Sequence, residues 1–185
     1  MVSGLPRSGT SMLMQMLAAG GIPVLTDGIR ESDEDNPKGY FELEAVKSIR
    51  SGAPWLSDAK GKAVKIVAPL LDSIPPEVPC RVILIERDVG EVLDSQARML
   101  ARRHEPLANT PERREILRRE YGRLLARIRL WLERRPGTGY LIVNRAAILH
   151  DPVSQAERIR IFLDGVPDAA LMAGAVDPGL NRNRG

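Results

Sequence analysis

Residues 2–11 read Val-Ser-Gly-Leu-Pro-Arg-Ser-Gly-Thr-Ser, and this stretch decides the fold class. Its first two residues can only be the end of a strand, and residues 9–19 show the spacing of apolar side chains that is typical of a helix. Gly4 and Gly9 bracket the loop between strand and helix. In such a unit the backbone N–H groups of the loop and of the helix N-terminus can point at one anion, and the neighbouring hydroxyls add donors. The stretch predicts a phosphate-binding loop; the plainer alternative is a strand–turn–helix with a serine-rich cap.

The rest of the chain alternates between strand and helix patterns. The clearest strand is residues 81–86, a short apolar and β-branched run. Further strands are expected at 22–25, 63–68 and 140–143, and helices at 42–50, 88–103, 110–135 and from 151 onward. Such alternation implies a parallel sheet with helices on both faces and ligands at the carboxyl ends of the strands. We therefore expect an α/β fold of the P-loop type, with three layers, built as a single domain of residues 1–185.

Composition limits the function classes. The chain has 185 residues and a mass of 20.4 kDa, with 43% apolar and 28% charged residues, so it can bury a core. No apolar run approaches the ~20 residues of a membrane span, and no secretory signal pattern is present. The single cysteine offers neither an internal disulfide nor a metal cluster. These features predict a cytoplasmic protein without a membrane span.

The positive charge is concentrated in one segment. Residues 98–135 hold twelve Arg and five Glu, whereas the whole chain carries a net charge of only +3. A solvated helix face is the ordinary interpretation of such a segment, and a surface that attracts an anionic ligand is the sharper one. Nucleic-acid binding is not expected, because aromatic side chains that could stack on bases are scarce.

The cation of the loop separates two classes of phosphate-binding protein. A nucleoside-triphosphate P-loop carries Lys directly after its second Gly, and here that position is Thr10. The cation is Arg7, two positions before Gly9. The run Pro-Arg-Ser-Gly-Thr-Ser resembles the 5′-phosphosulfate loop of sulfotransferases that use 3′-phosphoadenosine-5′-phosphosulfate. The resemblance implies this compound as the donor, and donor contacts from Pro6, Arg7, Ser8, Gly9, Thr10 and Ser11.

A second stretch resembles the motif with which that family holds the 3′-phosphate. The motif is a strand, an Arg at its end and a Ser eight positions later, and residues 82–86 are followed by Arg87 and Ser95. A guanidinium can donate two parallel hydrogen bonds to phosphate oxygens. Taken singly, Arg87 also fits a surface ion pair and Ser95 a neutral helix position. The run 181–185 resembles the family's closing basic segment, which implies Arg184 as a further phosphate contact; a frayed basic tail is the alternative.

Sulfuryl transfer also needs a group that takes the proton of the acceptor. Residues 64–70 resemble the family strand that carries a Lys and, in cytosolic members, a His two residues on. Lys65 matches the Lys, which implies that it steadies the bridging oxygen and the sulfuryl group. The position of the His is Val67. A carboxylate is therefore expected as the base, with Asp27 as the first candidate and Glu42 as the second.

Weaker indications come from four further residues. Arg145 stands where an adenine-contacting Tyr is common in the family. His104 and His150 lie on polar stretches and are expected at the surface. An alternative interpretation of Asp27, Glu42 and Glu44 is that they are solvated side chains or helix caps.

Together these resemblances imply a sulfotransferase that acts on a hydroxyl or amine of an unidentified small-molecule or other acceptor. No metal is expected to be required, because backbone dipoles and cations meet the charge of the donor. Two alternatives stay open. One is a kinase or nucleotide hydrolase of the same fold, against which Thr10 argues. The other is a non-catalytic nucleotide-binding protein that lacks a base, which Val67 supports.

Overall fold

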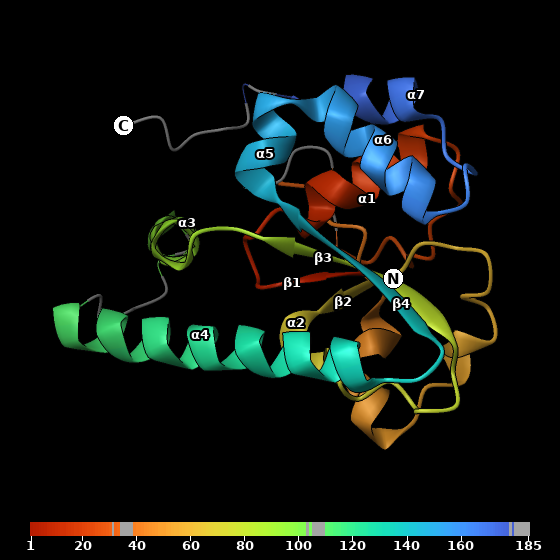
Figure 1. Ribbon diagram of the computed structural model, residues 1–185. Coiled ribbons are helices and arrows are strands. Elements are labelled where there is room, and N and C mark those ends of the chain that lie inside the picture. The colour runs from red at the N-terminus through yellow and green to blue at the C-terminus, as the bar shows by residue number, and fades with distance from the viewer. Residues whose placement is uncertain (31, 34–38, 103, 105–109, 178, 180–185) are drawn as a thin grey trace.

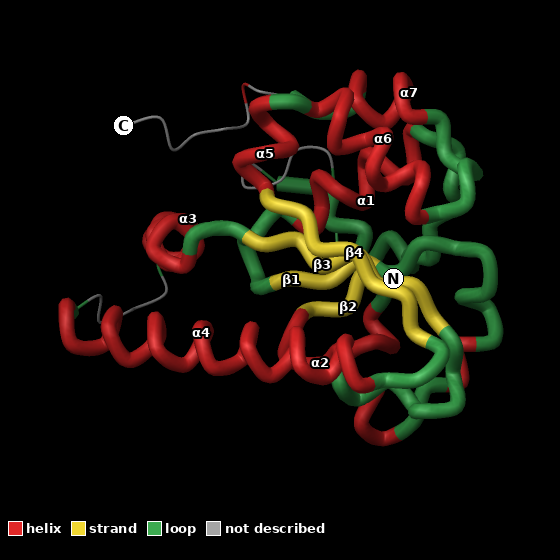
Figure 2. Tube along the Cα trace, viewed as in Figure 1, coloured by secondary structure: helices red, strands yellow, loops and turns green. Residues whose placement is uncertain are grey.

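A parallel sheet forms the centre of the protein (Figures 1 and 2). The computed structural model describes residues 1–30, 32–33, 39–102, 104, 110–177 and 179. Within these residues the sheet has four strands in the order β2-β1-β3-β4. The strands are β1 (Val2–Gly4), β2 (Lys65–Val67), β3 (Cys80–Glu86) and β4 (Thr138–Asn144). Since β1 pairs with β2 on one side and β3 on the other, the strand order reverses at β1, where open parallel sheets form ligand sites.

Helices cover both faces of this sheet (Figure 1). One layer contains α1 (Thr10–Ala19), α5 (Arg145–His150), α6 (Pro152–Phe162) and α7 (Ala169–Gly174). The other contains α2 (Ala68–Leu71), α3 (Val89–Arg102), α4 (Pro111–Arg134) and the 3₁₀ helices η1 (Glu44–Ser51) and η2 (Pro54–Leu56). No helix among the described residues is long and apolar enough to cross a membrane.

The alternation of side chains along β3 divides the core into two parts. Ile83 and Ile85 pack with the layer of α1, and Val82 and Leu84 pack with the layer of α4. All four side chains are buried, as expected for a strand with helices on both of its faces. The expected three-layer α/β architecture is confirmed.

Most expected elements are present, but two strands are shorter than predicted. Only an isolated bridge between Val24 and Ala63 occurs where a strand was expected at 22–25. Pro23 accepts a hydrogen bond there and has no N–H to extend a ladder. The strand expected at 63–68 is reduced to β2, because Ala68 already begins α2 and Pro69 favours a first helical turn.

The helix expected at 42–50 is a 3₁₀ helix, η1, and it begins at Glu44. The helix α4 begins as the sequence predicted. Thr110 accepts a hydrogen bond from the Arg113 N–H at 3.3 Å, and Pro111 takes the first helical position. The short helices α5 and α7 were not predicted.

Candidate active site

The predicted phosphate loop follows the carboxyl end of β1 and leads into α1 (Figure 1). Its backbone is tightly wound. The Ser8 N–H donates to the Leu5 carbonyl at 3.0 Å, and Gly9 adopts a φ of 109° as the N-cap of α1. Arg7 also has a positive φ, 74°, which is uncommon for a residue with a side chain. The strand–loop–helix geometry expected from the sequence is confirmed, with the first N–H groups of α1 at the end of the loop.

Gly4 and Ser8 pack against each other inside the loop. A Cβ atom on Gly4 would lie 2.4 Å from Ser8 Oγ and 2.6 Å from the Ile85 carbonyl oxygen. Ser8 is only 1% exposed, and its Oγ has no hydrogen-bond partner within the described part of the chain. A buried hydroxyl without a partner costs free energy.

Replacing Gly4 by Ala is expected to lower the free energy of unfolding by about 1–3 kcal/mol, because a Cβ has no room against the β3 backbone. The matched control is Gly122→Ala on α4, where a Cβ meets nothing within 4 Å. There Ala is expected to stabilise the helix by about 0.5–1 kcal/mol. Urea unfolding of both variants measures the difference, and equal stabilities would show that the loop does not have this close approach.

Three hydrogen bonds tie the loop to the segment after β3. Arg7 Nε donates to Ser95 Oγ at 3.1 Å, and Arg87 Nη1 donates to the Arg7 carbonyl at 3.1 Å. The Gln96 side chain donates to the Pro6 carbonyl at 3.0 Å. The two sequence motifs, 80 residues apart along the chain, are therefore neighbours in the structure.

The cations of this region are held with little exposure to water. The Arg87 side chain is 6% exposed, and its Nε donates to Glu91 at 2.8 Å. Burial lowers the pKa of Arg7. Arg145, the first residue of α5, covers the loop: a Cβ on Gly9 would lie 3.2 Å from Arg145 Cδ. Burial, followed by the nearby Arg87, lowers the pKa of Arg145 to about 10.

A second group of charges surrounds Glu42. Lys65 Nζ donates to Glu42 Oε1 at 3.1 Å, and Arg30 Nη1 donates to both Glu42 oxygens at 2.9 and 3.1 Å. The Lys65 side chain is 5% exposed and that of Glu42 is 26% exposed, so Glu42 is the more accessible partner. Burial alone would raise the pKa of Glu42, but Lys65 and Arg30 outweigh burial and the pKa lies below its ordinary value. Glu42 is therefore a carboxylate at neutral pH.

Tyr40 connects this group to the phosphate loop. Its carbonyl oxygen accepts hydrogen bonds from Lys65 Nζ and, at 3.4 Å, from Ser11 Oγ. Its ring stacks under the Arg30 guanidinium at 3.4 Å, and its hydroxyl donates to Asp33 at 2.6 Å. Tyr40 was not predicted as a residue of the site. The need of the buried Lys65 for acceptors was an indication that a further group lies here, but it could not name one.

Asp27 has a different environment from Glu42. Its carboxylate accepts hydrogen bonds from the backbone N–H groups of Glu44 and, at 3.0 Å, of Ile29. These hydrogen bonds, with that of Glu44 the stronger influence, lower the pKa of Asp27. One carboxylate oxygen thus holds the backbone where η1 begins, and the other holds the loop around Ile29.

The other predicted residues are not part of these contacts. His104 and His150 are exposed, as expected. Val67 ends β2, so a hydrophobic side chain occupies the position of the family's His. Arg184 lies outside the described residues. Among the residues that the structure describes, no three His, Cys, Asp or Glu side chains are grouped to hold a metal ion.

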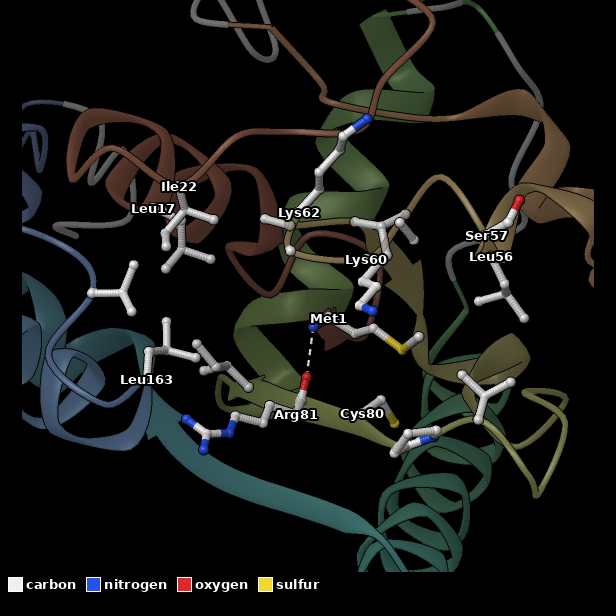
Figure 3. Close-up of a pocket in the computed structure, with 18 residues that line it drawn as sticks. Met1, Leu17, Ile22, Leu56, Ser57, Lys60, Lys62, Cys80, Arg81 and Leu163 are labelled. Atoms are coloured by element: carbon white, nitrogen blue, oxygen red, sulfur yellow. Dashed lines mark hydrogen bonds between the residues drawn. The ribbon is translucent and has the colours of Figure 1, made fainter.

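A cavity of about 680 Å³ lies at the opposite edge of the sheet, where β1 and β3 begin (Figure 3). Its walls are mainly apolar and include Leu17, Ile22 and Leu163, with Lys60 and Lys62 beside them. None of its lining residues was predicted for the donor or for catalysis. The lining also includes no residue of the phosphate loop, so the cavity is separate from that loop.

Comparison with known proteins identifies the architecture. No protein-family model matches the sequence, and no curated protein matches it. Among solved structures, a sulfotransferase from Alicyclobacillus acidocaldarius matches with a TM-score of 0.53 at 16% identity, over 97% of this chain and 87% of that chain. The chain has a sulfotransferase-like fold. At this identity the likeness establishes the fold of the chain, and its chemistry has to be argued from the site.

Proposed function

We propose that this protein is a sulfotransferase that transfers a sulfuryl group from 3′-phosphoadenosine-5′-phosphosulfate to a hydroxyl or amine acceptor. The observation that carries the proposal is the hydrogen bond from Arg7 to Ser95, because it joins the phosphate loop and the 3′-phosphate motif into one site. The position of this site beside β1, where the strand order reverses, and the sulfotransferase-like fold support it.

The residues of the site suit a donor whose ribose carries phosphate groups at both its 3′ and its 5′ positions. The loop backbone and the hydroxyls of Thr10 and Ser11 suit the 5′-phosphosulfate. Arg87 and Ser95 suit the 3′-phosphate, with Arg7 between the two halves. A kinase would need the Lys that Thr10 replaces, and nothing in the described site favours that activity.

The donor supplies a sulfuryl group, whose bond to the 5′-phosphate oxygen breaks as the acceptor atom bonds to sulfur. Lys65 is proposed to neutralise charge on the bridging oxygen, since the Tyr40 carbonyl that it contacts also accepts a hydrogen bond from Ser11 beside the loop. Glu42 is proposed to take the acceptor proton, because it is deprotonated, partly exposed and in contact with Lys65. Arg30 positions Glu42 through two hydrogen bonds.

Glu42 is preferred to Asp27 as the base on structural grounds. The Asp27 oxygens accept hydrogen bonds from the backbone N–H groups of Ile29 and Glu44, and this structural role explains the presence of Asp27 without chemistry. Glu42 contacts Lys65 instead, the residue that the family resemblance assigns to the reacting groups. The order of the two candidates is therefore reversed relative to the sequence analysis.

Arg87→Ala is expected to weaken binding of adenosine 3′,5′-bisphosphate by about 10–100-fold, and binding of ADP by much less, because a charge-assisted contact to the 3′-phosphate is lost. Arg87 also holds the Arg7 carbonyl, so Ser95→Ala is the companion variant that leaves this hydrogen bond intact. Ser95→Ala should also weaken binding of the bisphosphate more than binding of ADP, but by a smaller factor than Arg87→Ala. Calorimetric titration measures both, and equal losses for the two nucleotides would mean that Arg87 does not contact a 3′-phosphate.

A further inference from the structure

Three arginines lie at the carboxyl ends of neighbouring strands of the sheet. Glu86 pairs with Asn144 in the parallel register of β3 and β4, so Arg87 and Arg145 are the next residues of two paired strands. β1 lies on the other side of β3, and the loop that follows it carries Arg7. All three arginines therefore leave the sheet at the carboxyl ends of adjacent strands.

The side chain of Arg145 lies across the phosphate loop. A Cβ on Gly9 would be 3.2 Å from Arg145 Cδ and 3.5 Å from Cγ, so the arginine stem packs closely against the backbone of the loop. Burial is the largest cause that lowers the pKa of Arg145. The nearby Arg87 and Arg7 also lower it, and Glu91 raises it. Arg87, Arg7 and Glu91 are therefore among the charges near Arg145.

Three guanidiniums at the same end of the sheet attract an anion. Like charges in a half-buried region repel more strongly than in water, and a bound dianion relieves the repulsion between them. Arg87 Nη1 donates to the Arg7 carbonyl and Arg7 Nε donates to Ser95 Oγ, both at 3.1 Å, so Arg87 lies at the 3′-phosphate half of the proposed donor site and Arg7 lies between its two halves. Arg145 is next to Arg87 in the register of β3 and β4, which places it beside the 3′-phosphate half.

We propose that Arg145 is a third phosphate-binding guanidinium, which makes the site selective for nucleotides that carry a terminal 3′-phosphate. The inference rests on the proposed function and adds a specificity-determining residue to it. Arg145 is assigned to the phosphate and not to the face of the base, since the strand register places it beside Arg87 of the phosphate motif.

The test is calorimetric titration of the wild type and three variants with adenosine 3′,5′-bisphosphate and with 5′-AMP. Arg145→Met keeps the hydrocarbon over Gly9 and removes the charge, and Arg145→Lys keeps a single cation. Arg145→Met is expected to bind the bisphosphate about 10–100-fold more weakly and 5′-AMP within about 3-fold of the wild type. Arg145→Lys should lie between the wild type and Arg145→Met. The control is Arg158→Ala on α6, an exposed arginine that contacts Gln155 and should bind as the wild type does.

The two levels of the proposal fail in different ways. If the wild type prefers the bisphosphate but Arg145→Met weakens both nucleotides equally, or neither, the assignment of Arg145 is wrong and the proposed function stands. If the wild type shows no preference for the bisphosphate over 5′-AMP, the proposed donor itself is wrong, and the inference falls with it.

Discussion

Replacing Glu42 by Gln is expected to lower sulfuryl transfer by about 10²–10⁴-fold, the usual contribution of a general base. The substitution keeps the size of the side chain and removes the charge that contacts Lys65 and Arg30. Affinity for adenosine 3′,5′-bisphosphate should stay nearly unchanged, because Glu42 belongs to the group around Lys65 and not to the Arg7–Ser95 contact. An acceptor screen with labelled donor supplies the assay.

Glu44→Gln is the matched control for this prediction. Glu44 lies two residues away, is exposed and pairs with Lys47 at 2.7 Å on η1. Its neutralisation should leave the transfer rate unchanged. A wild-type rate in Glu42→Gln, or a loss in Glu44→Gln as large as that in Glu42→Gln, would show that Glu42 is not the base.

The pH dependence of the rate gives an independent check on the same residue. Burial raises the Glu42 pKa, but Lys65 and Arg30 outweigh it, so the pKa lies below the ordinary 4.5. A base must be deprotonated, and the rate should therefore fall only at pH values below this range. An acid limb near pH ~6.5 would instead indicate a histidine.

Replacing Arg7 by Ala is expected to weaken binding of adenosine 3′,5′-bisphosphate by about 10–100-fold, since one charge-assisted contact to phosphate contributes about 1.5–3 kcal/mol. Arg7 is the cation inside the phosphate loop, and its Nε already reaches Ser95 of the second motif. Unlike Arg87, it is expected to matter for ADP as well, because the loop binds the 5′ end of both nucleotides.

Arg119→Ala on α4 controls for a general loss of positive charge. Arg119 is exposed and pairs with Glu115 at 2.8 Å in the basic segment. Its removal should leave nucleotide affinity unchanged. If Arg7→Ala binds as tightly as the wild type, or if Arg119→Ala loses as much affinity as Arg7→Ala, the loop is not the donor site.

The elements that the sequence predicted best are those that local rules determine. The phosphate loop depends on two glycines within eight residues. The strand β3 depends on an uninterrupted apolar run, and α4 depends on helical apolar spacing and a Thr-Pro start. The adjacency of the loop and Arg87 followed from the expectation that parallel strands end at one edge.

The parts that sequence reasoning missed depend on contacts between distant segments. Tyr40 uses its backbone carbonyl to hold Lys65, and no residue type marks a backbone acceptor. The choice between Asp27 and Glu42 depends on which carboxylate binds the backbone of η1 and which binds Lys65. The course of the polar loop decides this, and its sequence has little periodicity from which to predict it. The strand expected at 22–25 is reduced to one bridge, because Pro23 has no N–H with which to extend the pairing.

The central claim is that the site binds a nucleotide with a 3′-phosphate, and calorimetric titration of the wild-type protein tests it most directly. Adenosine 3′,5′-bisphosphate and ATP are titrated separately, each with and without magnesium. The site described above predicts that the bisphosphate binds at least 10-fold more tightly than ATP, with no dependence on magnesium, because one charge-assisted phosphate contact is present for the first ligand alone. Tighter binding of ATP that requires magnesium would contradict the claim and favour a kinase or nucleotide hydrolase.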